Sequence, residues 1–155
     1  RSLINPDNAL FANPDDMESA IRKYCMDTNQ PVPETRGQIV RCIFESLALR
    51  YRQVLDDLRG LASQPIETLH VIGGGSRNEL LNQFTANAVG IPVVAGPSEA
   101  TALGNVMMQA MAIGEAADVP GMRKLIHNSI PLKTYQPQNM ENWGQAYIHF
   151  KNIVS

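Results

Sequence analysis

The chain has 155 residues, of which 44% are hydrophobic and 18% are charged, and its formal net charge is −2. A chain of this length can bury the core of one globular domain. Its 13 lysines and arginines are scattered without a basic run, so no nucleic-acid partner is expected. No apolar run approaches the roughly 20 residues of a membrane span, and no secretory signal opens the sequence. We therefore expect a cytoplasmic protein without a membrane partner.

The first residues bear on whether the chain is a fragment, and the cysteines bear on metal binding and disulfide formation. The sequence opens on Arg1 rather than methionine, and Arg1–Pro6 resembles the interior of a longer chain, so we expect a fragment or a processed product. Cys25 and Cys42 lack metal-ligand spacing, and the histidines do not cluster with them, so no metal site is expected. Both cysteines fit as small apolar core residues of separate helices. A disulfide between them stays open, because only geometry decides it.

The first third of the sequence predicts two helices. Asn13–Asp16 supplies a cap, a proline for the first helical position and acids for the first turn of a helix that ends before Gln30–Pro33. Thr35 and Gln38 have the spacing of a capping box, and a second helix follows to about Ser63. A helix of that length spans on the order of 40 Å, which is enough to cross a whole domain. Apolar residues surround its first half, which predicts burial on several sides.

The centre of the sequence predicts a strand, a glycine turn and a helix. Glu67–Ile72 is a short run of β-forming residues, and Gly73–Gly75 follows it directly. Ser76 and Glu79 have capping-box spacing, so the helix is expected to start at Ser76 and to stop at Gly90. Glycines let a ligand approach the backbone, and the helix start directs unpaired N–H groups toward it. This construction is typical of nucleotide cradles, although a tight turn without a ligand fits equally well.

The remaining sequence predicts a second strand, three helices and an extended segment. The strand is expected at 91–94, the helices at 98–114, 118–128 and 139–153, and the extended segment at 131–135. Ser98 is the expected cap of the first of these helices, and Gly104 marks close packing or a ligand approach. Trp143, Tyr147 and Phe150 are expected to anchor the last helix. The alternation of strands and helices predicts an α/β fold whose two strands are parallel, and further strands are expected upstream because two make a poor sheet.

The glycine turn fits neither of two common phosphate-binding motifs nor a serine nucleophile. A dinucleotide-binding fingerprint matches Gly73 and Gly75, but Asn78 stands in place of its third glycine and no acid ends the second strand at Ala95–Gly96. A Walker loop needs Gly-Lys-Ser or Gly-Lys-Thr, which does not occur here. Ser76 does not lie in a nucleophile elbow.

Five segments of the sequence form a more specific pattern. They are Asn13–Met17, Gln30–Thr35, Arg41–Leu49, Gly73–Gln83 and Ala95–Asn105. Together they resemble the C-terminal portion of the FGGY family of carbohydrate kinases, and the resemblance covers nearly the whole chain. It implies part of an actin-like ATPase (ribonuclease H-like) domain that is helix-rich with a small parallel sheet. Residues 1–155 would then be the C-terminal part of the second, nucleotide-side domain, without the N-terminal sugar domain.

The resemblance also implies a substrate and a nucleotide site. It implies an ATP-dependent sugar kinase that uses Mg²⁺, with L-rhamnulose as the expected sugar. By the match, Gly74 is the expected ATP contact, followed by Gly75 and by Asn78, whose amide donates and accepts hydrogen bonds. An Asn78 that is merely exposed in the first turn of a helix remains the alternative. Thr101 and Gly104 are expected to serve packing rather than ATP.

No catalytic residue is expected in this sequence. The family's general base is an aspartate from a segment upstream, and no aspartate here lies in a matching motif, so this chain alone is expected to be inactive. Three alternatives stay open: another FGGY kinase acting on xylulose, fuculose or glycerol, a non-catalytic nucleotide-binding module, and an NAD-binding domain. Apolar surface that normally meets the missing strands favours oligomers of the chain.

Overall fold

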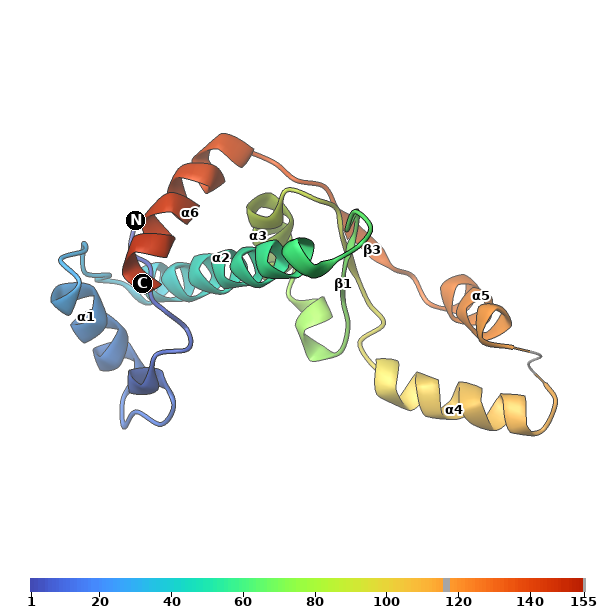
Figure 1. Ribbon diagram of the computed structural model, residues 1–155. Helices are drawn as coiled ribbons and strands as arrows, with labels where there is room; N and C mark the ends of the chain where they lie inside the picture. The colour runs from blue at the N-terminus through green and yellow to red at the C-terminus, as the bar shows by residue number, and fades with distance from the viewer. Residues whose placement is uncertain (116–117, 155) are drawn as a thin grey trace.

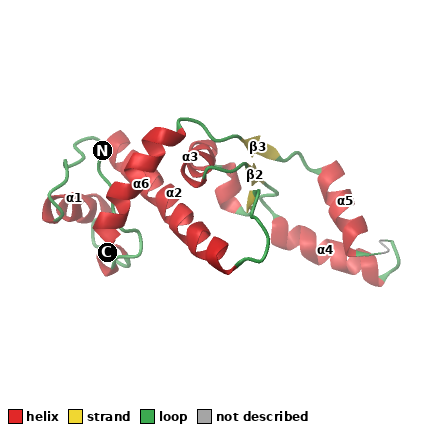
Figure 2. Ribbon diagram, turned by 45° about the horizontal axis from the view of Figure 1, so that its top comes forward, coloured by secondary structure: helices red, strands yellow, loops and turns green. Residues whose placement is uncertain are grey.

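The computed structural model describes residues 1–115 and 118–154, and it is built mostly from helices (Figure 1). In chain order the elements are η1 (Ala9–Phe11), α1 (Met17–Asp27), α2 (Arg36–Leu61), β1 (Leu69–Val71), η2 (Gly74–Arg77), α3 (Glu79–Val89), β2 (Val93–Ala95), α4 (Ala100–Ala112), α5 (Val119–Ser129), β3 (Lys133–Tyr135) and α6 (Met140–Val154). Figure 2 shows the short strands between the helical body and the projecting pair α4 and α5. Within the described ranges, no helix has the length and apolar character that crossing a membrane requires.

Both of the first two α-helices begin after a polar capping residue. The cap of α2 is the predicted one, and the cap of α1 is not. The Thr35 hydroxyl accepts from the Gln38 amide at 3.3 Å, and the Gln38 side chain accepts from the Thr35 amide at 3.1 Å, which confirms the capping box. α1 begins after Asp16, whose carboxylate accepts from two first-turn amides at 3.2 Å. The cap expected at Asn13 is therefore wrong, because Asp16 brings two acceptor oxygens to the same helix end.

α2 is the central helix of the body. Its buried residues are Ile39, Cys42, Glu45, Ser46, Ala48, Leu49 and Leu55. Its first half is covered on several sides, as expected, since one core cluster joins it to α1 and another joins it to α3 and α6. Trp143, Tyr147 and Phe150 are buried in the second of these clusters, which confirms that they anchor α6.

Three short strands form a mixed sheet in the order β1–β2–β3. β1 and β2 are parallel, with Leu69 opposite Val93, and α3 connects them, as expected. β3 pairs antiparallel with β2, with Tyr135 opposite Val93. The sheet is therefore not purely parallel, because the extended segment returns beside β2. Within the described residues β1 pairs with β2 alone, so its other edge is open.

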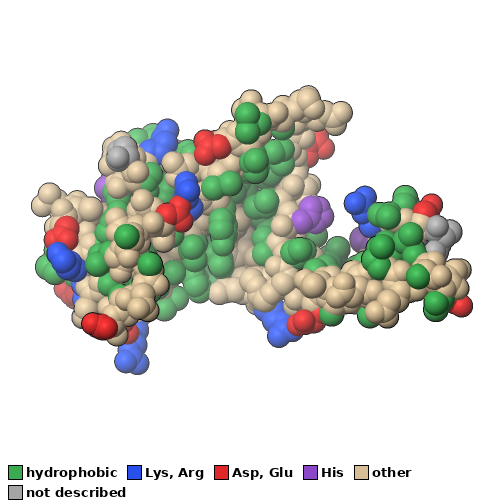
Figure 3. All heavy atoms as spheres, turned by 60° about the horizontal axis from the view of Figure 1, so that its bottom comes forward, with side chains coloured by type: hydrophobic (Ala, Val, Ile, Leu, Met, Phe, Trp, Pro, Cys, Tyr) green, Lys and Arg blue, Asp and Glu red, His purple; other side chains and the backbone are tan. Residues whose placement is uncertain are grey.

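An apolar groove runs along the open edge of β1. Its volume is about 610 Å³, and it is lined by Asp7, Arg50, Tyr51, Val54, Leu55, Leu58, Leu69, His70, Val71 and Ile72. Leu58 and Ile72 are 50% and 60% exposed. Figure 3 shows hydrophobic side chains gathered on the middle of one face, between the end that carries α1 and the projecting helices. An apolar surface of this kind favours association.

α4 and α5 project from the sheet and contribute little to the core (Figure 1). Apart from its chain neighbours and the backbone of its own helix, no atom of the described structure lies within 4 Å of a Cβ built on Gly104, so the close packing expected there is absent from that part of the chain. α4 begins after Glu99 without a side-chain cap. The cap expected at Ser98 is wrong, because the Ser98 hydroxyl accepts from the Arg77 guanidinium at 3.2 Å instead. α5 begins after Asp118, whose carboxylate accepts from the Gly121 amide at 2.7 Å.

Candidate functional site

The glycine turn leaves β1 and passes through η2 into α3. Gly73 has φ 74° and ψ −162°, a conformation that glycine adopts without strain and other residues do not. α3 begins after Asn78, whose side-chain oxygen accepts from the Leu81 amide at 3.0 Å. The helix start expected at Ser76 is therefore wrong. The Ser76 hydroxyl donates to the Gly73 carbonyl at 2.7 Å, so it closes the turn instead of capping the helix.

Asn82 in the first turn of α3 fastens the glycine turn to the helix. Its side chain is buried, with 1% of the residue exposed, and its Nδ2 donates to the Ser76 carbonyl at 2.9 Å. The same nitrogen lies 3.5 Å from the Gly75 carbonyl. Buried amides require hydrogen-bond partners, so Asn82 ties the shape of the turn to the position of α3. The sequence offered no signal for this role, because both partners are backbone atoms.

The loop after β2 lies beside the glycine turn, and the two segments form the two walls of a small pocket. Backbone hydrogen bonds of 2.8 and 3.1 Å join Val71–Gly73 to Gly96–Pro97. The Arg77 guanidinium crosses the same gap and pairs with the Glu99 carboxylate at 2.9 Å. A small pocket of about 130 Å³ lies between the two walls, and it is lined by Ile72, Gly73, Ser98, Glu99, Ala100, Thr101 and Ala102.

Gly74 and Gly75, two of the expected ATP contacts, lie on the exposed side of the turn. Neither has a left-handed backbone, and a Cβ built on Gly74 would meet no atom within 4 Å. A Cβ on Gly75 would make only an ordinary contact with Val71, at 3.9 Å. The fold therefore does not require glycine at either position, in contrast to Gly73. Bare backbone of this kind suits a ligand that lies flat against the turn.

Asn78, the third expected contact, is half-buried at the start of α3. Its oxygen is used as the helix cap. Within the described residues no hydrogen bond involves its Nδ2, so the NH₂ group remains a donor for a ligand. The Asn78 oxygen thus accepts one hydrogen bond within the chain, whereas its NH₂ group is unused among the described residues.

The charged side chains around the turn are paired with one another. Arg77 pairs with Glu99, and Lys133 of β3 pairs with Glu79 of α3 at 2.6 Å. The hydrogen bond from Lys133 to Glu79 raises the pKa of Lys133. A phosphate at the turn would have to compete with these carboxylates, so the uncharged donors suit the nucleoside end of a nucleotide better. No group of three or more His, Cys, Asp or Glu side chains in the described ranges could hold a metal ion.

The structure is thus a helix-rich α/β assembly in which an accessible glycine turn follows the edge strand of a small sheet. Residues 1–113 match the model of the FGGY family of carbohydrate kinases, C-terminal domain. The chain belongs to this family.

Individual relatives agree with the family match. A rhamnulokinase of Bacteroides thetaiotaomicron is 78% identical over 154 residues, which cover 99% of this chain and 32% of that protein. A rhamnulokinase of Pectobacterium carotovorum is 49% identical over 152 residues, which cover 98% of this chain and 31% of that protein. The chain thus spans about a third of the length of these curated relatives.

A solved structure confirms the fold class. The xylulose kinase from Rhodospirillum rubrum superposes with a TM-score of 0.59 at 20% identity, over 79% of this chain and 25% of that chain. At this identity the likeness concerns the fold alone. Together with the family match, it identifies the chain as a helix-rich α/β portion of the actin-like ATPase domain of this family.

Proposed function

We propose that this chain is the nucleotide-side portion of a cytoplasmic rhamnulokinase, which converts ATP and L-rhamnulose to ADP and L-rhamnulose 1-phosphate. The identity of 78% over 99% of the chain to a relative of that name carries the proposal. In this proposal residues 1–155 are the C-terminal part of the second domain. The sugar-binding domain and the catalytic aspartate belong to sequence that this chain does not contain.

The glycine turn supplies one wall of the ATP site. Gly74 and Gly75 let the adenine or ribose lie against backbone, and the Asn78 NH₂ group donates to an acceptor on the nucleoside. The glycine identity at Gly74 supports this role, because nothing in the described structure fills the space of a Cβ there. Mg²⁺ would be bound through the ATP phosphates, as is usual for this ion, rather than by a dedicated protein cage.

The chain alone lacks the groups that phosphoryl transfer needs. Such transfer requires a positioned base, a metal ion and cationic groups acting together on the phosphates. Arg77 and Lys133 beside the turn are already paired with carboxylates. We expect no L-rhamnulose-dependent ADP formation by the isolated chain, and such activity would contradict this division of roles.

Calorimetric titration with ATP tests the nucleotide site. Gly74→Val places a branched side chain where the nucleotide should lie, and Asn78→Asp keeps the capping oxygen but removes the donor. Each variant should bind ATP about tenfold more weakly or worse, since one lost contact of about 1.4 kcal/mol has that effect. Gly60→Val is the matched control, because a Cβ at Gly60 also meets no atom within 4 Å. Unchanged ATP affinity in both site variants would reject the assignment.

A chimeric enzyme tests the assignment to L-rhamnulose phosphorylation. This chain would replace the matching third of the rhamnulokinase of Bacteroides thetaiotaomicron. We expect the chimera to phosphorylate L-rhamnulose, and we expect Gly74→Val in the chimera to raise the KM for ATP more than the KM for the sugar. A folded chimera that forms no ADP with L-rhamnulose would contradict the proposal.

A further inference from the structure

The Arg77 side chain joins the two walls of the small pocket beside the glycine turn. Arg77 ends η2, and its Nη2 donates to the Glu99 carboxylate at 2.9 Å and to the Ser98 hydroxyl at 3.2 Å. Glu99 directly precedes α4, so one guanidinium reaches from the turn to the start of that helix. Ser98 and Glu99 also line the pocket, which has a volume of about 130 Å³.

The two walls are fixed to the body by different means. Asn82, which is buried, holds the glycine turn to α3 through the Ser76 carbonyl. Core packing gives the start of α4 no comparable anchor, because α4 contributes no buried residue. Two backbone hydrogen bonds between Val71–Gly73 and Gly96–Pro97, together with the Arg77 side chain, hold that start beside the turn. The spacing of the two walls therefore depends on Arg77.

We propose that Arg77 is a positioning residue of the nucleotide site, which sets the distance between the glycine turn and the start of α4 through Ser98 and Glu99. This inference rests on the proposed function, in which the nucleoside of ATP lies against the glycine turn. Arg77 acts through its two protein partners rather than on the phosphates, because the Glu99 carboxylate already neutralises its charge. A nucleoside on the turn then faces the second wall at a fixed distance.

The exposure of the ion pair limits the size of the effect. The Arg77 and Glu99 side chains are 69% and 70% exposed, so solvent and salt screen their attraction. Exposed pairs contribute little free energy, and we expect Arg77→Ala to weaken ATP binding by about two- to fivefold. The melting temperature should stay nearly unchanged, because substitutions on the exposed surface have small effects on stability.

Calorimetric titration of the complete chain with ATP and with adenosine tests the proposal. Adenosine has no phosphates, so a positioning role predicts that Arg77→Ala weakens the binding of both ligands by the same factor. A direct contact from Arg77 to a phosphate would weaken ATP binding alone, and this result would overturn the proposal. High salt should reduce the difference between Arg77→Ala and the unsubstituted chain, since the Debye length falls to about 3 Å at 1 M.

An exchange of the two charges tests whether Arg77 acts through Glu99. Arg77→Glu and Glu99→Arg should each weaken adenosine binding, because each places like charges beside one another. The double variant should recover most of the lost affinity, since it forms the ion pair in reverse. Adenosine carries no charge, so this recovery does not arise from attraction to the ligand. A double variant as weak as the two single variants would contradict action through Glu99.

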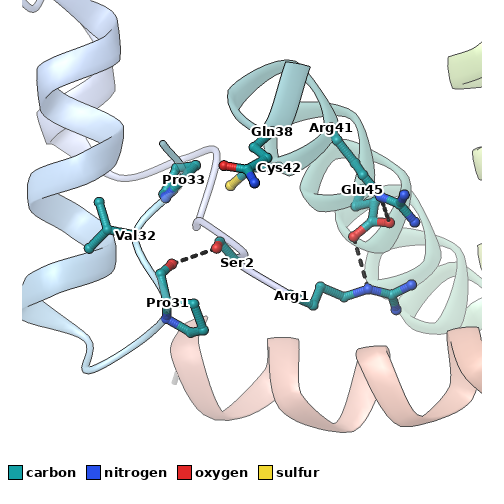
Figure 4. Close-up of a pocket in the computed structure, with 9 residues that line it drawn as sticks. All are labelled: Arg1, Ser2, Pro31, Val32, Pro33, Gln38, Arg41, Cys42 and Glu45. Carbon is teal, nitrogen blue, oxygen red and sulfur yellow. Dashed lines mark hydrogen bonds and ion pairs between the residues drawn. The ribbon is translucent and has the colours of Figure 1, made fainter. Parts of the chain in front are cut away.

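Two other ion pairs supply matched controls. Lys133→Ala removes the pair of Lys133 with Glu79, which lies beside the same turn but does not involve the start of α4. Arg41→Ala removes one of the two arginines that pair with Glu45 in the pocket between Arg1 and Glu45 (Figure 4). We expect Arg41→Ala to lower the melting temperature, because the Glu45 side chain is only 2% exposed. Both controls should keep the ATP affinity of the unsubstituted chain.

The outcomes separate this inference from the proposed function. If the unsubstituted chain binds neither ATP nor adenosine, the proposed nucleotide site is wrong, and the role of Arg77 is wrong with it. If the unsubstituted chain binds both ligands and Arg77→Ala binds them equally well, only the role of Arg77 is wrong. Equal weakening by Lys133→Ala would also overturn that role, because loss of any positive charge beside the turn would then have the same effect.

Discussion

Substitution of Asn82 by alanine should change both stability and nucleotide binding. The Asn82 amide is buried and donates to the Ser76 carbonyl at 2.9 Å. Its loss leaves that carbonyl without its partner, which costs about 1–3 kcal/mol. For a chain of this size the melting temperature should fall by roughly 2–12 °C, at about 2–4 °C for each kcal/mol. ATP affinity should fall as well, because Asn82 holds the shape of the glycine turn.

Asn87→Ala is the matched control for Asn82→Ala. Asn87 lies on the same helix and is also buried, at 7% exposure, and its oxygen accepts from Gln83 and from the Gln138 amide at 2.8 Å. These partners lie away from the glycine turn. Asn87→Ala should therefore lower the melting temperature but leave the ATP affinity at the value of the unsubstituted chain. Thermal unfolding by circular dichroism and calorimetric ATP titration measure the two effects. Equal ATP affinities for the two variants would refute the role assigned to Asn82.

The remaining predictions concern helix capping, pH and self-association. Thr35→Ala removes the acceptor of the capping box and should lower the free energy of unfolding by about 1 kcal/mol, measured by urea denaturation. Burial and a hydrogen bond to Asp56 raise the pKa of Tyr147 from 10.0 to about 12. Because the unfolded chain loses this proton first, the stability that Tyr147 contributes should be complete below pH 10.0 and lost as the pH rises toward about 12, and Tyr147→Phe should reduce this loss. Leu58→Lys in the apolar groove should shift light scattering from oligomers toward monomers, and an unchanged mass distribution would count against association through the groove.

Helix caps show how far the sequence alone determined local structure. Thr35 and Gly90 were predicted correctly, since each stands alone at its helix end with the right chemistry. The caps predicted at Asn13 and Ser76 are wrong for one shared reason. In each case a second capping residue follows within three positions, and only the backbone conformation selects between the two.

Contacts between distant segments explain what the sequence did not reveal about the site. The positions of Gly74, Gly75 and Asn78 follow from a local pattern of strand, turn and helix. The pairing of Arg77 with Glu99 and the antiparallel pairing of β3 depend on where later segments return. Neither has a periodic signal, because single side chains and an edge strand carry no amphipathic repeat.

Amide chemical shifts of the isotope-labelled chain, recorded during ATP titration, show directly whether the nucleotide lies against the glycine turn. We expect the largest changes at the Gly74 and Gly75 amides and at the side-chain NH₂ group of Asn78, while the Gly60 amide stays unchanged. Changes confined to another surface, such as the pocket between Arg1 and Glu45, would show that ATP does not bind at the glycine turn. So would the absence of any change at millimolar ATP.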